Sequence, residues 1–233
     1  METTIEIAKT AILVVDMQNA AYEVKQGFLG ATARRAREKD VAGNFAKVIK
    51  AAREVGMTIF YIADVHRQDH TDRIPKISDL ILKGVLEQGW EGTGVENTND
   101  GEFIPEIAPL PEDYVIKKRR FDAFFGTELE LQLRCLGIDT IIIGGLVTDI
   151  CVLATVVGAD QRDFNIIVLS DCTSTSVFQE NTDYVAVDNL FMSYLFPITS
   201  RVRTSDEVVT AMRSVIQKCE EDQMSEIDGE VSR

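Results

Sequence analysis

Three consecutive isoleucines at positions 141–143, followed by Gly144 and Gly145, place the strongest constraint on how this chain folds. An unbroken β-branched run is typical of a strand that is buried on both faces, as in a parallel sheet with helices on each side. The apolar run from Val152 to Val157 then has the composition of a helix. The stretch therefore predicts a strand, a turn and a helix, with Cys151 at or near the helix N-terminus.

The predicted position of Cys151 has two interpretations. Open α/β sheets bind ligands beyond the carboxyl ends of their strands. A helix N-terminus there offers N–H groups and a partial positive charge, which favour a thiolate over a thiol. The alternative is that Cys151 is a small buried apolar residue, as many cysteines are. Position alone leaves both interpretations open.

Five other apolar segments predict strands, each followed by helical periodicity, a turn or a polar loop: Lys9 to Met17, Met57 to Ala63, Tyr114 to Lys118, Asn165 to Ser170, and Pro197 to Val202. Six strands that alternate with helices predict a three-layer α/β fold. Its doubly wound, mainly parallel sheet would have helices on both faces and right-handed crossovers. The basic segment 20–39 is expected to be a surface loop. A dinucleotide site is disfavoured, because the glycine fingerprint is missing after the first strand.

Composition excludes several classes of protein. The 233 residues carry a net charge of −14, which argues against binding to nucleic acid or to anionic membrane surfaces. No apolar run approaches the roughly 18 residues of a membrane span, and the first residues do not resemble a signal peptide. We expect a cytoplasmic protein with one domain over residues 1–220 and an acidic, disordered tail over 221–233. The four cysteines have no metal-ligand spacing and are expected to be reduced.

Both histidines lie in one polar segment after the second predicted strand. Asp64, His66 and His70 are possible ligands of a divalent metal. Alternatively, His66 and Arg67 contact a substrate or a neighbouring subunit. We favour the second interpretation and expect no metal and no other cofactor, because a later histidine ligand is missing. Residues 84–103, which include the only tryptophan, are expected to form a lid or a subunit interface.

Three predicted strands end close to a residue whose side chain can take part in catalysis. These residues are Asp16, Lys118 and Cys151. The carboxyl ends of parallel strands meet at one edge of a sheet, so these side chains can lie together. A carboxylate can accept the thiol proton, an ammonium group can hold both partners, and helix N–H groups can bind an oxyanion. The set is therefore suited to nucleophilic catalysis.

Three sequence blocks carry a family resemblance, at residues 14–19 (VVDMQN), 118–129 (KRRFDAFFGTEL) and 145–152 (GLVTDICV). In this order and at these distances, they resemble the isochorismatase-like cysteine hydrolases. That family includes nicotinamidase, N-carbamoylsarcosine amidase, ureidoacrylate amidohydrolase and biuret hydrolase. The resemblance covers residues 10–202.

The resemblance implies roles for particular residues. The catalytic triad would be Asp16, Lys118 and Cys151, with Lys118 preferred over Lys117 by its distance from the phenylalanine pair that follows. A cis peptide would fall at Leu146–Val147, and the N–H groups of Val147 and Cys151 would form the oxyanion hole. The expected substrate contacts are Gln18, His66, Arg67 and Phe124.

The implied activity is hydrolysis of a small amide through a thioester, with release of ammonia. The loop from His66 to Asp72 looks more like that of carbamoyl and ureido hydrolases, in which an arginine such as Arg67 would hold a carboxylate. A metal-assisted nicotinamidase and a catalytically silent binding subunit are the alternatives. Hydrolases of the isochorismate vinyl ether lack the cysteine, so Cys151 argues against that branch. The partners expected are a small amide and further copies of the chain, as a dimer or tetramer.

Overall fold

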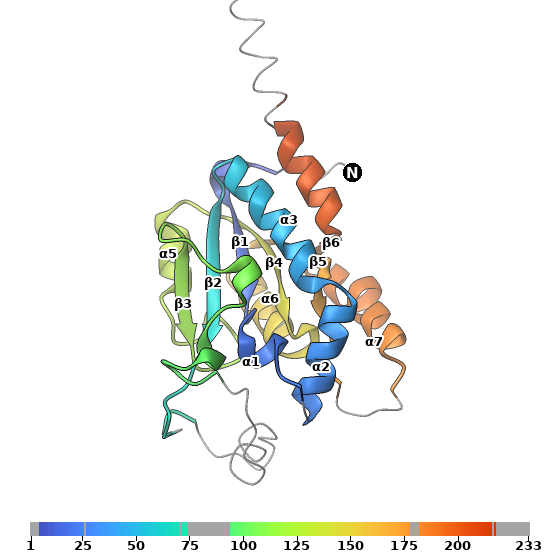
Figure 1. Cartoon of the computed structure of the whole chain (residues 1–233). Helices are drawn as coiled ribbons and strands as arrows, with labels where there is room; N and C mark the ends of the chain where they lie inside the picture. The colour runs from blue at the N-terminus through green and yellow to red at the C-terminus, as the bar shows by residue number, and fades with distance from the viewer. Residues whose placement is uncertain are drawn as a thin grey trace, which may run out of the picture.

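The computed structural model describes residues 5–25, 27–69, 71–73, 94–177, 182–215 and 217. Six strands form one parallel sheet in the order β3-β2-β1-β4-β5-β6 (Figure 1). They are β1 (Thr10–Val15), β2 (Thr58–Asp64), β3 (Tyr114–Lys118), β4 (Thr140–Leu146), β5 (Asn165–Ser174) and β6 (Arg201–Arg203). His70, residues 84–93 and the segment 221–233 lie outside the described residues. The predicted doubly wound α/β fold is confirmed.

Helices cover both faces of the sheet, which gives three layers (Figure 1). They include α1 (Asn19–Tyr22), α2 (Gly27–Glu38), α3 (Val41–Glu54), α5 (Leu129–Cys135), α6 (Leu153–Asp160) and α7 (Tyr184–Leu190). On one face, α3 and the helical residues 205–215 bury apolar side chains such as Phe45, Val48 and Met212. On the other, α5 and α6 bury Leu133 and Val156. Within the described residues, no helix has the length and apolarity that a membrane crossing needs.

The strand order reverses between β1 and β4, which are neighbours in the sheet although far apart in the sequence. All six residues of β1 are buried, and β4 is buried from Ile141 to Leu146. In open sheets of this kind, such a reversal opens a crevice beyond the carboxyl ends of the two strands. Asp16 directly follows β1 and Cys151 closely follows β4, so both lie where such a crevice is expected.

The glycine pair at the end of β4 is required by close packing. A Cβ on Gly144 would lie 2.9 Å from the ring of Phe45 and 2.8 Å from the carbonyl oxygen of Cys172. Gly145 has a φ of +125°, and a Cβ there would lie 1.9 Å from the carbonyl oxygen of Val15. The two glycines therefore let β4 approach β1 and β5 at the point where the chain turns toward Cys151.

Three segments differ from the sequence-based expectations. Residues 27–38 form helix α2 and not a surface loop; its buried face carries the small residues Ala33 and Ala36, which give little apolar signal. Strand β5 continues past Ser170 to Ser174, after an irregularity in its pairing with β4. The last strand is Arg201–Arg203, because residues 196–198 form a 3-10 turn that includes Pro197.

Replacement of Gly145 tests the close approach of β4 to β1. We expect Gly145→Ala to lower the free energy of unfolding by more than about 2 kcal/mol, since it adds a steric clash to an unfavourable φ. Gly137 is the control: its φ is +71°, but a Cβ added there would have no neighbour within 4 Å. Gly137→Ala should cost only about 1 kcal/mol. Equal losses in urea denaturation would contradict the clash with Val15.

Candidate active site

Asp16, Lys118 and Cys151 come together at the carboxyl edge of the sheet. The Lys118 Nζ lies 2.8 Å from Asp16 Oδ2 and 3.4 Å from Cys151 Sγ. Lys118 is 0% exposed, Asp16 5% and Cys151 7%. A fully buried ammonium group with a carboxylate and a thiol as neighbours is costly to place unless it is well paired. The close pairing of Lys118 with Asp16 and Cys151 is therefore what allows the ammonium group to be buried at this edge of the sheet.

Local backbone geometry directs each of these side chains. Asp16 adopts a φ of 51°, and its N–H donates to the carbonyl oxygen of Ile62 in β2 at 2.9 Å. In β3, side chains alternate between exposed and buried from Val115 to Lys118, so Lys117 faces out and Lys118 faces in. Cys151 lies in a π-helical turn, Thr148–Val152, which leads directly into α6.

Burial and charge separate the acid strengths of two nearby carboxyls. Burial raises the pKa of Asp16 to about 6, although the Lys118 ammonium group opposes the shift. Asp64 ends β2 and lies 3.9 Å from the Lys118 Nζ. Burial also disfavours its carboxylate, but Lys118 and His66 outweigh this cost and lower the pKa of Asp64 to about 2. Asp16 is thus the carboxyl that can exchange a proton near neutral pH.

The helix N-terminus is expected to favour the thiolate of Cys151, but the pKa of Cys151 is raised. Burial raises its pKa well above the ordinary value, and the negative charges of Asp16 and Asp64 act in the same direction. Lys118 favours the thiolate but does not outweigh these effects. The resting side chain is therefore a thiol that needs a base, and the helix terminus alone does not activate it.

A chain of polar contacts that starts at Lys118 does not follow from the sequence. His66 is buried between two carboxylates: its Nε2 lies 3.3 Å from Asp64 Oδ1, and its Nδ1 lies 3.3 Å from Asp72 Oδ2. Asp72 also pairs with Arg119, whose Nε lies 2.9 Å from the same oxygen. No motif marks Asp72, because the contact depends on how the loop after β2 folds back.

The structure gives the expected substrate-binding residues different surroundings. His66 is occupied by its two carboxylates. Arg67 is exposed and pairs with Asp69 at 3.1 Å, so its guanidinium group already holds a carboxylate. Phe124 is 4% exposed and packs in the apolar core, with its ring centroid 5.7 Å from that of Phe164. Neither the pairing of Arg67 nor the burial of Phe124 follows from sequence periodicity.

Gln18 connects three segments of the site. Its side-chain carbonyl accepts from the N–H of Asp64 at 2.9 Å, and its Nε2 donates to the carbonyl oxygen of Gly101 at 2.8 Å. The segment after Gly94 is also held by the His66 N–H, which donates to the Gly94 carbonyl oxygen at 2.7 Å. The described part of the expected lid or interface, residues 94–103, is therefore docked against the ends of β1 and β2.

The turn before Cys151 is fixed by side-chain hydrogen bonds to the end of β5. The hydroxyls of Thr148 and Thr173 lie 2.7 Å apart, and the carboxylate of Asp149 accepts from the N–H of Ser176 at 2.8 Å. The Leu146–Val147 peptide bond is cis. These contacts hold the backbone from Val147 to Cys151 beside the crevice.

The possible metal ligands are only partly described, because His70 lies outside the described residues. Asp64 and His66 contact each other directly. No group of three or more acidic, histidine or cysteine side chains suited to a metal ion occurs in the part of the chain that the structure describes.

Comparisons with known proteins place this geometry in a family. Residues 10–207 match the isochorismatase domain model. The chain is 29% identical to the isochorismatase family protein YwoC of Bacillus subtilis, over 90% of this chain and 97% of that protein. It is 28% identical to the ureidoacrylate amidohydrolase RutB of Rhizobium rhizogenes, over 73% of this chain and 72% of RutB.

A solved structure shares both fold and extent with this chain. It is a cysteine hydrolase from Pseudomonas syringae pv. phaseolicola, with a TM-score of 0.77 and 26% sequence identity, over 91% of this chain and 96% of that one. The fold is that of a doubly wound hydrolase. The chain belongs to the isochorismatase family of hydrolases.

Replacement of each of the two lysines that end β3 tests which of them is buried in the site. We expect Lys118→Met to lower the free energy of unfolding by about 3–5 kcal/mol, because it leaves the buried carboxylate of Asp16 and the partly buried one of Asp64 without their shared cation. Lys117 is the matched control, with a 62% exposed side chain 3.8 Å from Glu96. Lys117→Met should change stability by less than about 0.5 kcal/mol. A reversed order in denaturant titrations would show that the register of β3 is wrong by one residue.

Proposed function

We propose that this protein is a cysteine amidohydrolase that cleaves the C–N bond of a small carbamoyl, ureido or carboxamide compound. The observation that carries the proposal is the buried ammonium group of Lys118, which contacts both Asp16 and Cys151. The named activity of the relative RutB, ureidoacrylate amidohydrolase, and the name of the cysteine hydrolase of Pseudomonas syringae support it.

Asp16 serves as the general base in the proposed reaction. Its Oδ2 is held by Lys118, whereas Oδ1 is buried and has no hydrogen-bond partner among the described residues. A pKa of about 6 leaves this carboxyl ionised at neutral pH and still basic enough to accept a proton. Asp16 takes the proton of Cys151 as the sulfur attacks the carbonyl carbon, and Lys118 stabilises the developing thiolate.

The later steps return the proton and release the product. The sulfur–carbon bond forms and the carbonyl oxygen becomes an oxyanion, which the N–H groups of Val147 and Cys151 stabilise. The C–N bond then breaks, and Asp16 gives its proton to the departing ammonia. Water, deprotonated by Asp16, attacks the thioester and frees the thiol of Cys151. Each cycle consumes one water and releases one ammonia.

Substitution of cysteines tests the nucleophile. We expect Cys151→Ala to abolish ammonia release across a panel of N-carbamoyl amino acids, ureidoacrylate, biuret, maleamate and nicotinamide, with circular dichroism unchanged. Cys172→Ala is the control, because Cys172 is buried near Phe45 and Gly144, away from Lys118. It should keep most of the activity. Activity of Cys151→Ala within tenfold of the native protein would refute the assignment.

The pH dependence of kcat/KM tests the base. Asp16 must be ionised to accept a proton, so we expect kcat/KM to fall as the pH drops below about 6. The carboxylate of Asp64 contributes to the raised pKa of Asp16. Asp64→Asn should therefore move the acidic limb to lower pH. A limb that stays near 6 in Asp64→Asn would assign it to another group.

A further inference from the structure

Arg120 differs from the other cations at this end of the sheet. Lys117 and Arg119 both lie within ion-pair distance of Glu96, at 3.8 and 2.7 Å, and Arg67 pairs with Asp69. For Arg120, no carboxylate of the described residues lies within ion-pair distance. An arginine that is held in place without a counterion is suited to bind an anion from solution.

The guanidinium group of Arg120 is fixed through one nitrogen only. Its Nη1 donates to the carbonyl oxygen of Asp72 at 3.2 Å and to that of Arg119. The carboxylate of Asp72 is directed elsewhere, to His66 and Arg119. A guanidinium group has five N–H donors, so the edge formed by Nε and Nη2 keeps three of them. Within the described chain, no hydrogen bond is formed by this edge. It has the geometry that binds a carboxylate through two parallel hydrogen bonds.

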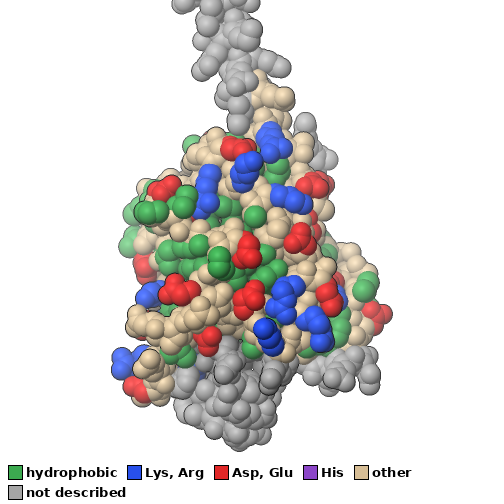
Figure 2. Space-filling model, in the orientation of Figure 1, with side chains coloured by type: hydrophobic (Ala, Val, Ile, Leu, Met, Phe, Trp, Pro, Cys, Tyr) green, Lys and Arg blue, Asp and Glu red, His purple; other side chains and the backbone are tan. Residues whose placement is uncertain are grey.

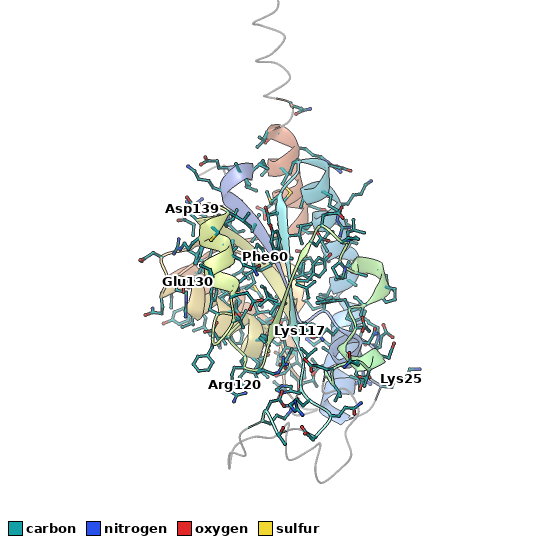
Figure 3. The ribbon with its side chains drawn as sticks, turned by 90° about the vertical axis from the view of Figure 1, so that its left-hand side faces the viewer. Lys25, Phe60, Lys117, Arg120, Glu130 and Asp139 are labelled. Atoms are coloured by element: carbon teal, nitrogen blue, oxygen red, sulfur yellow. The ribbon has the colours of Figure 1, made fainter. Side chains whose placement is uncertain are left out.

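Arg120 lies on the segment that connects the two sides of the active site. The segment begins at Lys118, and at its other end the N–H of Ala123 donates to Thr155 Oγ1 of α6 at 3.1 Å. Helix α6 directly follows the turn that carries Cys151. Figure 3 shows Arg120 at the same end of the molecule as Lys117, where β3 finishes. A group bound by Arg120 would therefore lie beside the segment that joins Lys118 to the helix after Cys151. Through Asp72, which contacts His66, Arg120 is also linked to Asp64 at the end of β2.

We propose that Arg120 is the specificity-determining residue of this site and that it binds a carboxylate on the substrate, at the end opposite the scissile amide. This inference rests on the proposed amidohydrolase function. It assigns the substrate to the anionic ureido or carbamoyl acids, and it places recognition of the acid on Arg120 instead of Arg67.

A pair of substrates of similar size isolates the carboxylate. 3-Ureidopropionate carries a carboxylate, whereas propylurea has a methyl group in that position, and both release ammonia from the same ureido group. We expect Arg120→Ala to lower kcat/KM for 3-ureidopropionate about 10- to 100-fold, which is the usual range for loss of a charged hydrogen-bonded pair. The value for propylurea should stay within about twofold. Arg120→Lys should recover only part of the loss, because lysine keeps the charge but lacks the planar fork.

Lys117→Ala is the matched control, since it removes one positive charge at the same strand end without removing the fork. It should leave the ratio of the two kcat/KM values unchanged. An equal loss on both substrates in Arg120→Ala would show a structural role only, and no loss on either would also overturn the proposal.

A binding measurement separates this proposal from the proposed chemistry. The dissociation constant of 3-ureidopropionate for Cys151→Ser, measured by calorimetry, should rise about 10- to 100-fold when Arg120→Ala is added. If this shift occurs although the native protein releases no ammonia, the amidohydrolase function fails and the anion site stands. Absence of binding to Cys151→Ser, or equal affinity with and without Arg120, would overturn the anion site.

Discussion

The burial of one ammonium group between two carboxylates is the interaction on which the site depends. Lys118 comes from β3, Asp16 from the end of β1 and Asp64 from the end of β2, so the cation joins three adjacent strands at their carboxyl ends. Without these partners, a fully buried lysine would lose its charge or prevent folding. The same contact that allows the lysine to be buried therefore also sets the distance between the strand ends.

The two carboxylates are not equivalent, and the difference has a physical cause. Asp64 faces His66 as well as Lys118, which lower its pKa, whereas Asp16 faces Lys118 and the negative charge of Asp64, which raises its pKa. The better-paired carboxylate stays ionised, and the other becomes the stronger base. Two acids with separated pKa values around one cation are a common way to obtain a base that works near neutral pH. In this chain, His66 contributes to that separation through Asp64 and need not touch a substrate.

Much of the fold could be predicted from the sequence, because buried parallel strands give continuous apolar runs. The runs Lys9 to Met17, Met57 to Ala63 and Tyr114 to Lys118 predicted three of the strands, and the glycine pair marked the end of β4. Helix α2 does not follow from the sequence pattern because its buried face is made of small residues such as Ala33 and Ala36 and its arginines form polar contacts: Arg35 pairs with Asp188 at 2.5 Å, and Arg37 donates to the carbonyl oxygen of Tyr22. An arginine-rich segment of this kind has no apolar stripe to detect.

The candidate site was predictable where it depends on strand ends and not where it depends on loops. Asp16, Lys118 and Cys151 end up together because parallel strands align their carboxyl ends. The partners of Arg67 and Arg120 depend on how the loops fold, which no periodicity encodes. The family resemblance likewise indicated residue types but not which arginine keeps an edge without a hydrogen bond among the described residues.

The hydrogen bonds of Gln18 to Asp64 and Gly101 bear on how well the chain between Arg73 and Gly94 can be replaced by another segment. The chain is held on both sides of this segment. Before it, Asp72 in the loop after β2 contacts His66 and Arg119. After it, the carbonyl oxygen of Gly94 accepts from the His66 N–H, and the side chain of Gln18 donates to Gly101. With both attachment points fixed, doubling the length of a flexible insert at this place would cost only about 0.6 kcal/mol of closure entropy. The framework is therefore suited to loop grafting, in which a new segment is joined to unchanged ends of β1 and β2.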